Sequence, residues 1–147
     1  MSSKATTAQL TEAGWDAKQF GDPADFTAYL QSLLDTVAAM VRDIVGASTY
    51  DAAMDGLTFT RLQQLELALS EAALWRRRAA FMDSSVAAYR GSEIEYSRLI
   101  ARYYANADQA DGRAAELYRA LGVTPPGSGG LSGGVLQTGA DFSEVTV

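Results

Sequence analysis

Two pairs of carboxylates in this 147-residue sequence have a spacing that suits acid–base chemistry or metal binding. Asp51 with Asp55, and Asp108 with Asp111, would each share one face of a helix. The residue that most often transfers protons in enzymes is histidine, and this sequence contains none. Because acidic side chains are usually exposed, we interpret both pairs as solvated acidic surface.

The second pair also lies in a segment with some features of a calcium loop, beginning at Asn106. An EF-hand loop needs an oxygen ligand at its fifth position, glycine at its sixth and a bidentate glutamate at its twelfth. Ala110, Asp111 and Leu117 occupy those positions here, so the sequence predicts no calcium site. The chain also has no cysteine, which excludes disulfides, thiolate catalysis and cysteine-type zinc sites.

The sequence has one basic cluster, Trp75-Arg76-Arg77-Arg78. Nucleic-acid binding requires many Lys and Arg contacts to phosphates, whereas this chain has a net charge of −6 and a pI near 4.5. Successive helical residues also point in different directions. Arg76 and Asp83 fall on one helical stripe, so we predict an ion pair between them, within one subunit or between two.

The glycine-rich segment 127–134 is not a phosphate-binding loop, because it lacks the Gly-Lys-Ser/Thr ending. Residues 130–134 within it match the letters G-x-S-x-G at Ser132, but the sequence indicates neither a strand before this segment nor a helix after it, so it is not a nucleophile elbow. From these observations we predict a protein that is not an enzyme and that uses no cofactor and no metal.

The chain length suits one domain, and its patterns predict an all-α fold. We expect residues 1–22 to form a lead-in with a short helix, which Thr6 and Gln9 cap and Gly14 ends. Trp15 and Phe20 then stay exposed unless they pack on the helical body, which we place at residues 23–122.

The first helix of the body is predicted to begin at Asp22-Pro23, an N-cap followed by a proline at the first helical position. It should end at Gly46. Residues 48–56 read as one helical turn and a loop. The inner face of the helix that ends at Gly46 should consist of apolar side chains at three- and four-residue spacing; these are Phe26, Leu30, Leu33, Val37, Met40, Val41 and Ile44.

A long helix should follow, from a cap at Thr58 to Tyr89 or Arg90. Its apolar arc is unusually wide: Leu62, Leu65, Leu69 and Ala72 form one stripe, and the other contains Leu67, Leu74 and Phe81 with Trp75 and Met82 beside it. A narrow strip with Glu66, Ser70, Arg77 and Ser84 is polar. A helix that is apolar on most sides is buried on more than one. We therefore predict a subunit interface that includes Leu67, Leu74, Trp75, Arg76 and Phe81.

Gly91 breaks this helix, and Ser92-x-x-Glu95 is a capping box for a second long helix that reaches Leu121. The short connection predicts an antiparallel hairpin of the two long helices. Its inner face should consist of Tyr96, Leu99, Ile100, Tyr103, Ala107, Ala110, Ala114, Leu117, Tyr118 and Leu121.

Residues 123–147 are predicted to be a flexible linker and an extended docking arm. Pro125-Pro126 stop any helix, and the glycines of 127–134 form a spacer with a reach of about 15–20 Å. One alternative is a disordered extension. The other is β-augmentation, in which the arm adds a strand to a partner's sheet. The predicted partner-binding residues are Val135, Leu136, Phe142, Val145 and Val147.

This combination resembles the head–tail connector, or adaptor, proteins of tailed bacteriophages. The resemblance rests on residues 47–53 leading into the alanine-rich helix of residues 65–76, followed by the second long helix and the arm. It implies a homo-oligomeric ring, typically a dodecamer, that joins head to tail at the portal vertex of the virion. The implied partners are the portal protein and a downstream tail or stopper protein.

In such a ring DNA passes through the lumen without sequence-specific binding, and an acidic wall would repel it. The chain would be made in the host cytoplasm, and it has no apolar stretch of membrane-spanning length. The alternative interpretation is a cellular helical-bundle adaptor or regulatory subunit that docks a partner through its C-terminal tail.

Overall fold

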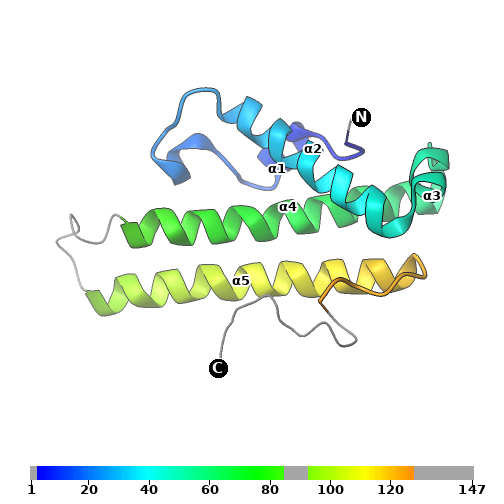
Figure 1. The fold of residues 1–147 in the computed structure, drawn as a ribbon. Coiled ribbons are helices and arrows are strands. Elements are labelled where there is room, and N and C mark those ends of the chain that lie inside the picture. Colours follow the sequence, from blue (N-terminus) through cyan, green and yellow to red (C-terminus); the bar gives the residue numbers. More distant parts are fainter. Residues whose placement is uncertain (1–2, 85–92, 128–147) are drawn as a thin grey trace.

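The computed structural model describes residues 3–84 and 93–127 (Figure 1). The helices, in chain order, are α1 (Thr7–Glu12), the 3-10 helix η1 (Ala17–Phe20), α2 (Phe26–Val45), α3 (Ala47–Ala52), α4 (Gly56–Ser84) and α5 (Glu93–Ala120). Across these two ranges the chain forms helices and turns without a strand, which confirms the predicted all-α class.

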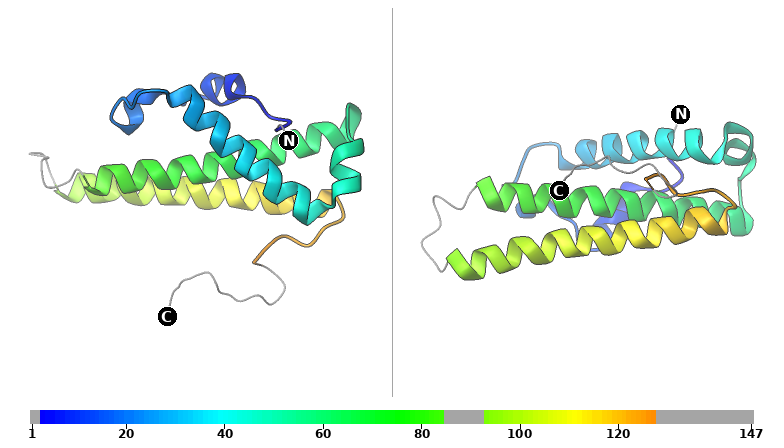
Figure 2. Two further views of the ribbon diagram at one scale, coloured as in Figure 1. Left: turned by 45° about the horizontal axis from the view of Figure 1, so that its top comes forward. Right: turned by 60° about the horizontal axis from the view of Figure 1, so that its bottom comes forward.

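The two long helices, α4 and α5, lie side by side and antiparallel along their lengths (Figures 1 and 2). This confirms the predicted hairpin. Helix α2 crosses one side of α4, and α3 turns the chain into the start of α4 at one end of the hairpin. The predicted break at Gly91 and the Ser92 cap lie outside the described residues.

One apolar cluster joins α2, α3, α4 and α5 near the end of the hairpin where α3 leads into α4. Tyr118 of α5 is 1% exposed in it, and Val123 packs against it after the chain turns at Gly122, whose φ of +81° suits glycine. Pro125 is also buried, so the folded body continues past the predicted end at Gly122. The buried members are Val37, Ala38, Val41, Tyr50, Ala53, Leu62, Leu65, Ala68, Ala114 and Tyr118.

A second cluster incorporates the lead-in. Trp15 and Phe20 are 4% and 8% exposed, and the Trp15 ring meets Trp75 of α4 edge-on with centroids 4.8 Å apart. The capping box of Thr6 and Gln9 is present as predicted. The lead-in is therefore part of the core. The buried members are Ala5, Leu10, Trp15, Phe20, Leu30, Leu34 and Leu74.

Helix α2 differs from its prediction at both its start and its face. It begins at Phe26, because Asp22 and Asp25 adopt the left-handed conformation with φ of 57° and 56°, which interrupts the helix after Pro23. Met40, expected inside, is 41% exposed, whereas Leu34 is fully buried. Helix α4 likewise begins at Gly56, two residues before the predicted cap.

Candidate functional site

The predicted carboxylate pair Asp51 and Asp55 does not act as a pair. Asp51 accepts two hydrogen bonds from Arg42, at 3.0 Å from Nε and 2.8 Å from Nη2. The hydrogen bond from Arg42 lowers the pKa of the Asp51 carboxyl below its usual value. Asp55 is exposed beyond the end of α3. Arg42 and Asp51 thus form a surface ion pair between α2 and α3.

The second pair, Asp108 and Asp111, binds an arginine across the hairpin. Arg76 Nη2 lies 3.3 Å from Asp108 Oδ1 and also donates to Asp111. Arg76 therefore joins α4 to α5 and uses these two acids in place of Asp83 of the same chain. A pair with Asp83 of another subunit stays a prediction. Among the described residues no group of three or more acidic side chains is arranged to hold a metal ion.

The other two arginines of the basic cluster lie against aromatic rings of the same chain. The Arg77 guanidinium is 4.8 Å from the centroid of Tyr29, and that of Arg78 is 4.6 Å from Tyr103. These distances fit cation–π contacts. Arg76 and Arg78 thus contact different residues of α5, whereas Arg77 contacts Tyr29 of α2. The three side chains diverge, as expected for successive helical residues.

The five predicted interface residues lie in different environments. Leu74 is fully buried within one chain, so it has no surface to offer a neighbouring subunit. Trp75 is half-buried between Trp15 and Tyr103, with a centroid distance of 5.3 Å to the latter. Leu67 is half-buried, whereas Phe81 is 36% exposed.

A buried carboxylate, which sequence reasoning missed, holds the N-terminal segment in place. Glu66 of α4 is 0% exposed, although we had assigned it to a polar strip. Its Oε1 accepts hydrogen bonds from the backbone N–H groups of Lys4 (2.8 Å) and Ala5 (2.9 Å). Its Oε2 accepts one from the Tyr50 hydroxyl. The signal was a single acid between Leu65 and Leu67 in a mostly apolar helix.

Lys4 adds further contacts at the same place. Its Nζ donates to the carbonyl oxygen of Ala53 (2.8 Å) and lies 4.3 Å from the centroid of the Tyr50 ring. Its own carbonyl accepts from Gln63 Nε2 (3.0 Å). The N-terminal segment is thus fastened to the corner where α3 meets α4.

In contrast to the hydrogen-bonded Glu66, the buried hydroxyl of Tyr118 has no hydrogen-bond partner among the described residues. We expect Tyr118→Phe to raise the free energy of unfolding by about 1–2 kcal/mol, because the unsatisfied hydroxyl is removed. Burial raises the pKa of Tyr118 to about 12. The wild type should therefore lose stability between about pH 10 and 12, where only the unfolded tyrosine ionises, and the variant should lose less.

Urea denaturation at pH 7 and at several alkaline values measures both effects. Tyr104→Phe is the matched control, since Tyr104 is 44% exposed and should change little. A destabilised Tyr118→Phe variant would show that the hydroxyl has a partner in solution.

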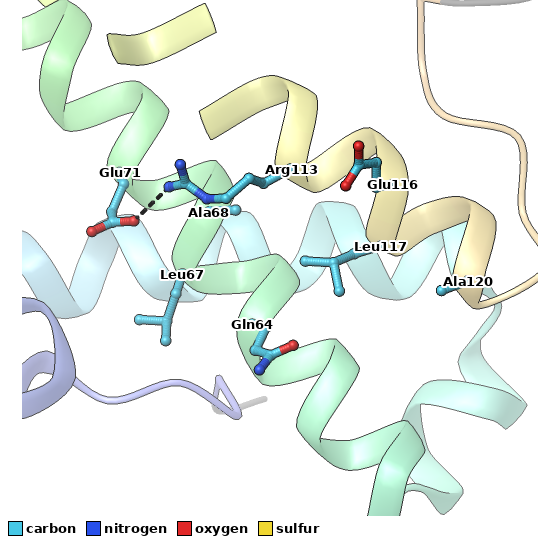
Figure 3. A pocket seen from close by; sticks show the side chains of 8 residues that line it. All are labelled: Gln64, Leu67, Ala68, Glu71, Arg113, Glu116, Leu117 and Ala120. Carbon is cyan, nitrogen blue, oxygen red and sulfur yellow. Dashed lines mark hydrogen bonds and ion pairs between the residues drawn. The ribbon is translucent and has the colours of Figure 1, made fainter. Parts of the chain in front are cut away.

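An apolar groove lies between α4 and α5 near the end of the hairpin (Figure 3). Its volume is about 570 Å³, within the usual range for ligand pockets. Leu117 points from α5 toward α4, and Arg113 reaches across to Glu71 at 3.0 Å. In Figure 3 α2 lies behind the hairpin, so the groove opens on the opposite face. The lining residues are Gln64, Leu67, Ala68, Glu71, Arg113, Glu116, Leu117 and Ala120.

Within the described residues, a second exposed apolar surface lies at the corner between α3 and α4. Met54 is 78% exposed and Leu57 64% exposed. We call these two side chains the corner surface. Large apolar side chains exposed together indicate a contact site more often than a single exposed one does.

The predicted partner-binding residues of the arm lie outside the described residues; they are Val135, Leu136, Phe142, Val145 and Val147. No helix within the two described ranges is long and apolar enough to cross a membrane.

Comparisons with known proteins add no relative to this picture. No protein-family model matches the chain, and no curated protein or solved structure matches it either. The candidate functional site therefore consists of the groove and the corner surface, as the geometry of this chain alone defines them.

Proposed function

We propose that this chain is a structural virion protein of the head–tail connector class. It forms a homo-oligomeric ring, typically of twelve copies, at the portal vertex. The ring joins the phage head to the tail and lets DNA pass. Its C-terminal arm docks on the portal protein, and its other end meets a tail or stopper protein. The protein acts by assembly and not by catalysis.

The observation that carries this proposal is that the described residues of one small helical body form two different exposed apolar surfaces. Met54 and Leu57 protrude at the corner, and the groove between α4 and α5 opens elsewhere on the hairpin. A head-to-tail contact between two unlike patches generates a closed ring when the rotation closes. One such contact covers both surfaces in every subunit.

The charge of the chain supports a role around DNA. Its net charge is −6, and phosphate is repelled by a wall of the same sign. Exposed acids such as Asp43 and Asp55 add to this surface. A ring of such subunits can surround DNA without retaining it.

The arm supports the contact with the portal. Val145 and Val147 alternate with Glu144 and Thr146, and in an extended strand such alternation places the two valines on one side. Strand addition to the sheet of a partner uses this arrangement, with alternate side chains filling pockets. The glycine-rich spacer before it gives the arm its reach.

Removing the corner surface tests the ring. The double variant Met54→Ser/Leu57→Ser should stay folded, because both side chains are largely exposed. It should no longer form a closed ring on a purified portal. Native mass spectrometry and electron microscopy of the mixture measure the copy number.

Met40→Ser is the matched control, since Met40 is 41% exposed on α2 and is not part of the corner surface. A closed ring from the double variant would overturn the head-to-tail contact. A wild-type chain that does not bind the portal but binds a cellular partner in a one-to-one complex would favour the alternative, a cellular adaptor.

A further inference from the structure

The groove between α4 and α5 needs an occupant, because its floor is apolar. Leu67 and Leu117 contribute branched side chains from opposite helices, and Ala68 and Ala120 leave the space beside them open. The polar groups lie at the rim, where Arg113 bonds to Glu71. An apolar segment with little secondary structure of its own would fit such a floor.

The described part of the chain offers no segment that can fill this groove from within. The exposed corner residue Leu57 belongs to the same helix as Gln64 and Leu67, so it cannot fold back onto them. Candidates for an occupant from the same chain must therefore come from the three parts outside the described ranges, 1–2, 85–92 and 128–147.

Only the last of these parts has both the length and the position. Residues 85–92 are tied at both ends to α4 and α5, and Ser84 is about 24 Å along α4 from Ala68 at 1.5 Å per residue. Residues 128–147 begin next to Gly127, seven residues after the groove residue Ala120. Seven residues span at most about 25 Å.

The composition of this last part fits the groove as well. It contains no Lys or Arg and carries Val135, Leu136 and Phe142. The seven residues from Ser128 to Gly134 span up to about 25 Å when extended, enough to bring Val135 back from Gly127 to Ala120. Because a short flexible tether gives an effective concentration of about millimolar, docking on the same molecule prevails over docking on a neighbour at micromolar protein.

We propose that in the free subunit residues 135–147 lie in the groove between α4 and α5 of the same chain. Docking there covers the apolar anchors of the arm and the floor of the groove at once. In combination with the proposed function, on which this consequence rests, the portal removes the arm from the groove. The groove then becomes open to a neighbouring subunit, so the ring closes after portal binding and not before.

A nitroxide label on the arm tests the proposal in the full chain. The chain has no native cysteine, so Ser143→Cys takes a single label. We expect the amide signals of Gln64, Leu67 and Leu117 to lose most of their intensity, whereas Thr36 on the far side of α2 keeps its own. An equimolar mixture of isotope-labelled chain without nitroxide and nitroxide-labelled chain without isotope should show no such loss.

Blocking the groove provides the matched pair of variants. Ala120→Arg places a long side chain at the groove, and Ala101→Arg places the same side chain on exposed α5 surface elsewhere. The first should restore the broadened signals and the second should not. Gln64→Arg, at the opposite rim, should repeat the effect of Ala120→Arg if that variant unfolds.

Two results would overturn the proposal: undiminished groove signals in the labelled chain, or a loss of signal in the mixed sample alone, which would place the arm on a neighbouring copy. Neither measurement uses the portal. A failure here therefore leaves the ring proposal standing, and a failure of the ring leaves this result unchanged.

Discussion

Replacing Glu66 with alanine should lower the free energy of unfolding by about 3–5 kcal/mol, because three donors lose their acceptor and each unsatisfied buried donor costs about 1–3 kcal/mol. The carboxylate is 0% exposed and accepts hydrogen bonds from Lys4, Ala5 and Tyr50. Removing it leaves two backbone N–H groups and one hydroxyl buried without their acceptor, and each such group is costly. For a domain of this size the loss is a large part of total stability.

In the Glu66→Ala variant the N-terminal segment should detach under conditions in which the rest of the domain is still folded. The N-terminal segment is fastened at Glu66, and its residues Ala5, Leu10 and Trp15 belong to the second apolar cluster. We therefore expect hydrogen exchange of the lead-in to become much faster at denaturant concentrations where α4 and α5 remain folded. This outcome would distinguish release of the segment from general destabilisation.

Urea denaturation of a matched series measures the effect. Glu66→Gln keeps an acceptor oxygen and should be milder than Glu66→Ala. Tyr50→Phe removes one donor and should cost about 1–2 kcal/mol. Glu116→Ala, at an exposed position of α5, should stay within about 0.5 kcal/mol of the wild type. A Glu66→Ala variant as stable as Glu116→Ala would show that the carboxylate does not hold the segment.

Tyr50 gives this site a pH dependence that can be predicted in sign. Burial and the hydrogen bond to Glu66 raise the pKa of Tyr50 above its ordinary value of 10.0. Its contribution to stability is therefore complete below about pH 10 and is lost as the pH rises toward the folded-state pKa. Tyr50→Phe should weaken this alkaline loss, although it destabilises the protein at neutral pH.

The hairpin could be predicted from sequence because its signals are local. Residues such as Tyr103, Ala107 and Ala114 recur at helical spacing, and the structure buries all three. The start of α2 could not be predicted from sequence, since Asp22-Pro23 has the residue types of a helix N-terminus but Asp22 adopts a left-handed conformation. Helix boundaries depend on the conformation of one or two residues, which composition does not determine.

The environment of Glu66 and the groove were beyond sequence reasoning for a different reason. Glu66 is satisfied by residues 61 and 62 positions earlier and by Tyr50. The groove depends on how α4 and α5 pack against each other, with Ala68 and Ala120 among its lining residues. Both features arise from tertiary packing, which a pattern along one helix does not contain.

Truncation after Gly127 should leave the body folded and abolish binding to the portal. Both apolar clusters lie within residues 5–123, and Pro125 is buried as well. A cut after Gly127 therefore keeps the described core intact, whereas a cut before Pro125 removes a buried residue. We expect a fall of no more than about 2 kcal/mol in the free energy of unfolding, the scale of a weakly docked segment.

Loss of portal binding is expected from the proposed function, in which Val135, Leu136 and Phe142 are the apolar anchors of the arm. Co-purification of the truncated and full chains with a portal ring measures it. Phe142→Ala in the full chain should weaken binding by about 1–3 kcal/mol, roughly five- to 150-fold, if its ring fills a pocket. Thr138→Ala, a polar position between the anchors, is the control and should bind like the wild type. A truncated chain that still binds the portal would place the docking contact on the helical body, with the corner surface of Met54 and Leu57 as the next surface to test.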